Sequence, residues 1–234
     1  MDKEMSEQSA AQEYRIRSYV LRAGRMSDSQ RRSYEALFPR YGIPFDTVAL
    51  DYTSVFSKRN PLIIEIGFGM GIATAMIAEA NPGVNYLGIE VHRPGIGKLL
   101  WEIERRNLSN VRIIEHDAVE TLERMIPAAS VAGFHIFFPD PWPKKRHHKR
   151  RLITRPFTDL LASRLVPGGY LYMVTDWAEY GDWALAELSA TQGLLNAYDG
   201  FALPQSWRPE TRFERKGIEK QHIVRELYFK QGKI

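Results

Sequence analysis

Apolar positions follow two alternating patterns along most of the chain. Short, nearly continuous apolar runs, typical of strands buried on both faces, occur at 61–67, 84–91, 111–117, 131–140 and 170–176. Segments with helical spacing follow these runs, at 72–80, 96–107, 118–126, 154–169 and 177–190. Two closing strands are predicted at 194–203 and 222–230. The alternation predicts an α/β fold, with a parallel sheet covered on both faces and right-handed crossovers.

The first part of the chain lacks this alternation. Residues 1–55 are polar and basic, so we expect a partly flexible N-terminal extension, 1–55, followed by a domain, 56–234. Ser27 or Asp28 could cap a short helix within the extension. Two interpretations stay open: a mobile tail, or a basic arm that becomes ordered on a partner.

Composition narrows the class of protein. The chain has 234 residues, of which 44% are hydrophobic and 26% charged, as in soluble globular domains. It has no cysteine, which excludes disulfides and thiolate metal sites. The stretch MDKEMSEQSAAQEYR is not apolar, and no segment reaches the ~18 apolar residues of a membrane span. We therefore expect a cytoplasmic protein without membrane contact.

Positive charge is concentrated in one segment. The net charge is +4, from 32 basic and 28 acidic residues. Six of the cations lie between positions 144 and 151, and without them the balance is slightly acidic. A field this local indicates a site for a polyanion. His147 and His148 lie among these cations, and their neighbours argue against a metal site.

Acidic residues stand at or near the end of each predicted parallel strand. They are Glu65, Glu90, Asp117, Asp140 and Asp176. Acids are rare in strands, and each one alone could be a turn or cap residue. Ligands of open α/β sheets bind outside the carboxyl ends of the strands. The set of five therefore predicts a site at that edge.

A glycine-rich loop after the first strand suggests which ligand binds there. Its glycines are Gly67, Gly69 and Gly71, and Ile72 stands where a dinucleotide fingerprint requires glycine. Glu90 follows at about the interval of a ribose-binding acid. Glu65 suits a cationic group better than phosphates, which it would repel. A nucleoside with a positively charged tail, S-adenosylmethionine, satisfies both conditions.

Several motifs together resemble the bacterial tRNA (guanine-N7-)-methyltransferase family. They are RAGRMSDSQ, EIGFGMG, GIEVHRPG, HDA, FFPDPWPKKRHHKRR, VTDW and TRFERKG, and the resemblance covers nearly the whole chain. The PDPWPKKRHHKRR block is highly specific, whereas the glycine loop alone is not. Departures are small: His116 stands where relatives often have asparagine, and Met70 lies within the glycine loop.

The resemblance implies a fold, a reaction and residue roles. The fold would be Rossmann-like, of the class I methyltransferase type, with seven strands and an antiparallel closing strand. The reaction would move a methyl group from S-adenosylmethionine to N7 of guanine 46 in the variable loop of tRNA. Glu65, Gly67, Gly69, Gly71, Glu90, Asp117 and Asp140 would bind the donor. Substrate and tRNA contacts would come from Lys144, Arg146, His147, His148, Lys149, Arg150, Arg151, Asp176, Thr211, Arg212, Phe213 and Glu214.

Asp140 is the predicted catalytic residue. Guanine N7 has an exposed lone pair, so its attack on the methyl group requires placement and no general base. Asp140 could stabilise the cationic purine or accept hydrogen bonds from the guanine N1–H and 2-amino groups, and both roles stay open. Pro139 and Pro141 would stiffen the backbone around it. Trp142 could stack on a base or serve packing.

Three rival functions remain at this point. A nicotinamide-dependent dehydrogenase shares the fold, but the glycine spacing is against it. A non-catalytic RNA-binding protein is disfavoured because all five acids are present. A methyltransferase for another RNA or a small molecule is the third, and the basic segment disfavours the small molecule. Monomer and homodimer are both compatible with the sequence.

Overall fold

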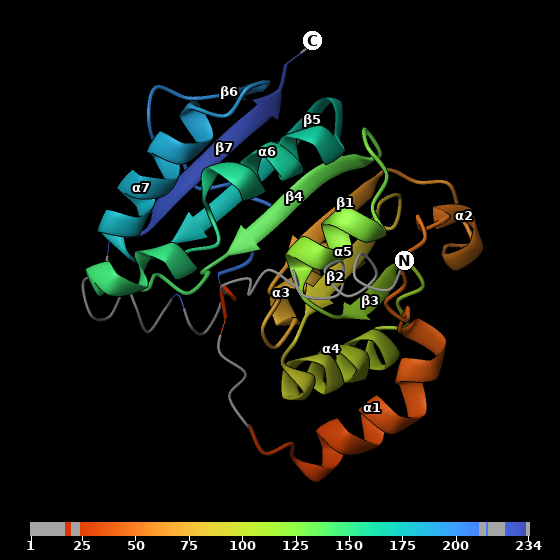
Figure 1. The fold of residues 1–234 in the computed structure, drawn as a ribbon. Helices are drawn as coiled ribbons and strands as arrows, with labels where there is room; N and C mark the ends of the chain where they lie inside the picture. The colour runs from red at the N-terminus through yellow and green to blue at the C-terminus, as the bar shows by residue number, and fades with distance from the viewer. Residues whose placement is uncertain (1–16, 20–23, 211–213, 215–222, 233–234) are drawn as a thin grey trace, which may run out of the picture.

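The computed structural model describes residues 17–19, 24–210, 214 and 223–232. Its centre is a sheet of seven strands in the order β3-β2-β1-β4-β5-β7-β6 (Figure 1). The strands are β1 (Leu62–Ile66), β2 (Asn85–Glu90), β3 (Val111–Glu115), β4 (Val131–Phe137), β5 (Leu165–Thr175), β6 (Leu194–Asn196) and β7 (Arg225–Gln231). The helices are α1 (Asp28–Tyr41), α2 (Tyr52–Val55), α3 (Ile72–Ala80), α4 (Arg93–Arg105), α5 (Ala118–Arg124), α6 (Arg155–Arg164), α7 (Ala178–Ser189) and the 3₁₀ helix η1 (Lys145–Arg150).

The strand directions agree with the predicted topology. β1 pairs in parallel with both β2 and β4, and β7 pairs antiparallel with β5 and β6. The mostly parallel sheet with an antiparallel closing strand is therefore confirmed. The chain order reverses between β1 and β4, because β1 leads to β2 on one side and meets β4 on the other. Such a switch point opens a crevice at the carboxyl ends of the strands.

Alternation along the strands sends side chains to two hydrophobic cores. Ile63 belongs to a core with residues of α3 and α4, whereas Ile64 belongs to a larger core with residues of α5, α6 and α7. Because side chains alternate across a strand, neighbouring isoleucines reach opposite faces. All five residues of β1 are buried, as expected of a central parallel strand.

The boundary between α6 and β5 differs from the prediction. The helix predicted to reach 169 ends at Arg164, and Leu165 already pairs with Val131 of β4. Pro167 cannot donate a helical hydrogen bond, and Gly168 has a φ of +79°, so the segment cannot continue as a helix. The predicted strand 131–140 likewise ends at Phe137. Neither α2 nor η1 was predicted.

The described part of the N-terminal extension packs on the domain. Ser27 caps α1 in a capping box with Gln30, which confirms the predicted cap. α1 lies along α4 (Figure 1), and the Ile43 amide donates to the Ile113 carbonyl of β3 over 2.8 Å. The domain boundary at residue 55 stays a prediction. In the part of the chain that the model describes, no helix is long and apolar enough to cross a membrane.

Candidate functional site at the carboxyl edge of the sheet

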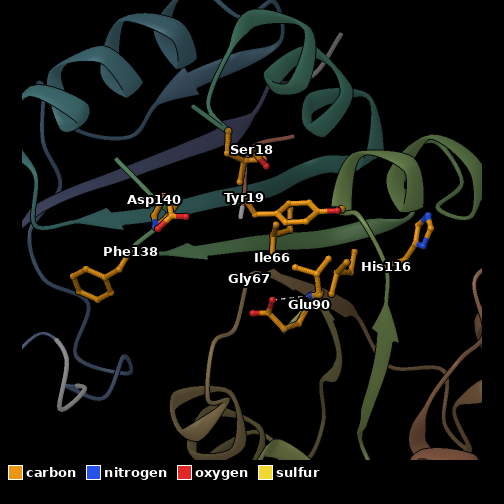
Figure 2. Close-up of a pocket in the computed structure, with 13 residues that line it drawn as sticks. Ser18, Tyr19, Ile66, Gly67, Glu90, His116, Phe138 and Asp140 are labelled. Atoms are coloured by element: carbon orange, nitrogen blue, oxygen red, sulfur yellow. Dashed lines mark hydrogen bonds between the residues drawn. The ribbon is translucent and has the colours of Figure 1, made fainter. Parts of the chain in front are cut away.

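A cavity of about 210 Å³ lies at the switch point of the sheet (Figure 2). Its walls come from the ends of β1, β2 and β4, from the β3–α5 turn and from the N-terminal segment. They are formed by Ser18, Tyr19, Ile66, Gly67, Ile89, Glu90, Val91, His116, Ala118, Phe138, Pro139, Asp140 and Leu152. Two predicted acids, Glu90 and Asp140, therefore line the same cavity.

The glycine loop takes a left-handed backbone path that residues with side chains rarely adopt. Gly67, Gly69 and Gly71 all have positive φ, at 70°, 56° and 66°. Gly71 is the left-handed cap of α3, and a Cβ there would lie 2.6 Å from the Leu99 Cβ of α4. The loop thus lies close against α4, and its approach to a ligand stays a prediction.

Glu90 fastens this loop to the end of β2. One of its carboxylate oxygens accepts from the Gly69 amide at 2.9 Å. The other accepts from the amides of Val91 and His92 at 2.7 and 3.0 Å. Each oxygen has two lone-pair sites, so Glu90 can still accept a hydrogen bond from a ligand in the cavity.

Glu65 is a buried acid with an open oxygen. Glu65 is 3% exposed, and its Oε2 has no hydrogen-bond partner among the described residues. Burial raises the pKa of Glu65 to about 7, which the nearby Thr74 opposes and the charge of Glu90 reinforces. Glu65 does not line the cavity, but Ile66 and Gly67 directly after it do. A cationic group that donates a hydrogen bond to Glu65 would satisfy this oxygen. Glu65 is therefore compatible with the ammonium tail of S-adenosylmethionine.

The β3–α5 turn forms another part of the wall. Asp117 caps α5, and its side chain accepts from the amides of Val119 and Glu120 at 2.9 and 3.1 Å. His116 lines the cavity, with its ring stacked on Phe45 at a centroid distance of 3.6 Å. Sequence reasoning noted His116 only as a departure, and nothing in the pattern pointed to Phe45.

Asp140 is exposed at the end of β4, between two residues with unusual backbones. Phe138 and Trp142 have φ values of 51° and 46°, a region that bulky residues rarely occupy. The Phe138 amide donates to the Val174 carbonyl of β5 at 2.8 Å. Strain of this kind persists only where the surroundings impose it, and it concentrates at functional sites. The backbone conformation around Asp140 is therefore set by more than Pro139 and Pro141.

Ser18 and Tyr19 are wall residues that sequence reasoning missed. In Figure 2 the Tyr19 ring lies across the cavity between Asp140 and His116. The Trp142 indole donates to the Ser18 carbonyl at 2.9 Å, and the Arg150 guanidinium lies 4.5 Å from the Trp142 ring. Trp142 thus packs within the protein and joins the N-terminal segment to the basic segment. An aromatic residue in a basic stretch was the only signal for Tyr19.

The basic segment forms η1 beside the cavity, and its cations are not equivalent. Lys144, Lys145, Arg146 and Lys149 are exposed. Arg151 is different, because its side chain is 0% exposed and donates to the Pro141 carbonyl and to Glu179, each at 3.0 Å. Arg151 is therefore enclosed and paired within the protein, and its contact with RNA stays a prediction.

The predicted substrate residues are only partly described. Asp176 is half-buried directly after β5. Glu214 is buried in an ion pair with Arg208. Thr211, Arg212 and Phe213 lie outside the described residues. Within the described ranges, no group of three or more histidine, cysteine or acidic residues could hold a metal ion.

Comparison with known proteins agrees with this geometry. A family model described as "Putative methyltransferase" matches residues 59–227. The tRNA (guanine-N(7)-)-methyltransferase of Nitrosospira multiformis is 50% identical over 219 residues, covering 93% of this chain and 96% of the relative. The protein of the same name from Paraburkholderia xenovorans is 52% identical over 217 residues, covering 93% and 84%.

A solved structure confirms the fold. The 16S rRNA methyltransferase KamB superposes with a TM-score of 0.55 at 14% identity, covering 94% of this chain and 99% of that one. At this identity the likeness concerns the fold alone, and it confirms the expected class I methyltransferase architecture.

Proposed function

The chain belongs to the tRNA (guanine-N7-)-methyltransferase family, and we propose that it methylates N7 of guanine 46 in the variable loop of tRNA. The methyl donor is S-adenosylmethionine and the product is N7-methylguanosine. One observation carries the proposal beyond the family: Asp140 and Leu152, which flank the basic segment in the chain, both line the cavity, and Lys145, Arg146 and Lys149 of η1 are exposed. A donor site and a polyanion site would thus adjoin. Action on tRNA makes this a cytoplasmic enzyme.

The donor would be held by the glycine loop and the acids around it. Glu90 would bind the ribose hydroxyls, Asp117 the adenine end, and Glu65 the cationic tail. Gly67, Gly69 and Gly71 would let the backbone approach the ligand. The donor supplies an electrophilic methyl group on a sulfonium. These residues would orient it, and the apolar residues Ile66 and Ile89 also line the cavity.

Asp140 would stand where donor and base meet. The guanine becomes cationic when N7 accepts the methyl group, so a carboxylate next to it stabilises the transition state more than the ground state. No proton has to be removed, and accordingly no general base is invoked. The strained backbone at Phe138 and Trp142, on either side of Asp140, supports this role, because such strain concentrates at functional sites.

The RNA would lie across η1 and the end of β5. Lys144, Arg146, His147, His148, Lys149 and Arg150 would contact phosphates, which supplies position and affinity and no sequence information. Asp176 and the segment around Glu214 would contact the target nucleoside.

Transfer of labelled methyl to two tRNA transcripts tests the proposal. One transcript is natural and the other has adenine in place of guanine 46. We expect label in the first alone, released on depurination as N7-methylguanine. Label in both transcripts would mean that the protein is a tRNA methyltransferase with a target other than guanine 46. Label in neither, with tRNA still bound, would favour a non-catalytic RNA-binding protein.

A further inference from the structure

Arg208 is a buried cation with an unusually complete set of partners. Its side chain is 6% exposed. Two guanidinium nitrogens donate to the two oxygens of Glu214, each at 2.6 Å. The guanidinium also donates to Glu226 at 2.9 Å and to the Tyr172 hydroxyl at 3.1 Å. Four of the five N–H donors of the guanidinium are thereby used.

These partners join Glu214 to the sheet. Glu226 lies on β7 and Tyr172 on β5, and the Tyr172 hydroxyl in turn donates to Glu226. Glu214 and Glu226 are 5% and 3% exposed. A buried carboxylate needs such partners to stay charged, so Arg208 helps to hold Glu214 in its place.

The neighbouring residue connects this cluster with the catalytic edge. Trp207 stacks on His135 of β4 at 4.9 Å, and His135 stacks on Phe137 at 5.2 Å. Phe137 is the last residue of β4, and the chain continues from it to Asp140. The segment with Arg208 is therefore packed against the two strands that end at Asp140 and Asp176.

We infer that Arg208 is a positioning residue of the methyl-transfer site, which holds the predicted substrate residue Glu214 in place. This rests on the proposed function. Lysine cannot replace arginine here, because an ammonium group lacks the planar fork that matches two oxygens.

The test compares Arg208→Lys with a matched variant at another paired arginine. Arg106 pairs with Glu102 at 3.0 Å and with Glu79, near the amino edge of the sheet. We expect Arg208→Lys to lower kcat/KM for a tRNA transcript by about tenfold to a hundredfold, with KM for S-adenosylmethionine unchanged. Arg106→Lys should lower the melting temperature without this selective loss. Equal effects of the two variants on tRNA kinetics would overturn the inference.

A double-mutant cycle separates positioning from general support. If Arg208 acts through Glu214, the double variant Arg208→Lys/Glu214→Gln has the kcat/KM of Glu214→Gln alone. If Arg208 only stabilises the fold, the two losses multiply. Multiplied losses would therefore contradict the inference even when Arg208→Lys is impaired.

Hydrogen exchange tests the anchor independently of catalysis. Arg208→Lys should speed amide exchange in peptides containing Glu214, and Arg106→Lys should not. Faster exchange in Arg208→Lys alone supports the anchor even if the wild-type chain leaves tRNA unmethylated, a result that would refute the proposed function instead. Unchanged exchange in Arg208→Lys would overturn the anchor whatever the activity.

Discussion

At the scale of single residues, the negative charge of Asp140 is the feature on which the proposed catalysis depends most. Asp140→Ala should lower kcat for tRNA methylation by about a hundredfold or more, because stabilisation of the developing cation is lost. The dissociation constant for tRNA should stay within about twofold, since phosphate contacts dominate affinity. Single-turnover methylation and filter binding measure the two quantities. Asp159→Ala, at an exposed acid on α6, is the matched control.

Asp140→Asn distinguishes the two roles of the carboxylate. The amide keeps one oxygen that can accept from guanine but removes the negative charge. A variant as slow as Asp140→Ala would assign the effect to charge, and one close to wild type would assign it to base anchoring. Unchanged kcat in all Asp140 variants would refute a catalytic role.

At the scale of elements, the glycine loop depends on a close approach of α4. A Cβ on Gly95 would lie 1.8 Å from the Gly69 carbonyl, far inside van der Waals contact. Gly95→Ala should therefore displace the loop and weaken S-adenosylmethionine binding by about tenfold or more, with about 1–3 kcal/mol lost from the free energy of unfolding. Calorimetric titration and denaturant unfolding measure these changes.

Gly83→Ala is the control for that variant. Gly83 lies in the turn before β2, and a Cβ there would have no neighbour within 4 Å. It should leave donor affinity unchanged. Equal donor affinity in both variants would show that the loop tolerates displacement from α4.

Elements set by local pattern were predictable, and elements set by tertiary contact were not. The buried run of β1 and the glycines after it are local signals, and the structure has both. The end of α6 was missed because Leu165 is taken by a strand pairing with β4, which helical spacing does not reveal. Tyr19 lines the cavity and Arg151 is buried because of contacts with residues distant in the sequence. No local pattern in the chain indicated either placement.

At the scale of the whole molecule, the distribution of charge decides how RNA approaches. The exposed cations of η1 stand next to the cavity, whereas Lys58 and Arg59 precede β1 at the opposite edge of the sheet. Any two of the exposed η1 cations contribute as much to the net charge as Lys58 and Arg59 do. The two sets differ only in their position on the molecule. Only cations that contact phosphates release counterions when RNA binds.

A comparison of two double variants follows from this asymmetry. Arg146→Gln/Lys149→Gln should reduce the slope of log binding constant for tRNA against log salt concentration by about 1 to 2 units, because two phosphate contacts are lost. Lys58→Gln/Arg59→Gln should leave the slope unchanged, although its net charge falls equally. Fluorescence titrations of labelled tRNA over a range of salt concentrations measure both slopes. Equal reductions would mean that tRNA responds to total charge, and the RNA surface would then have to be sought away from η1.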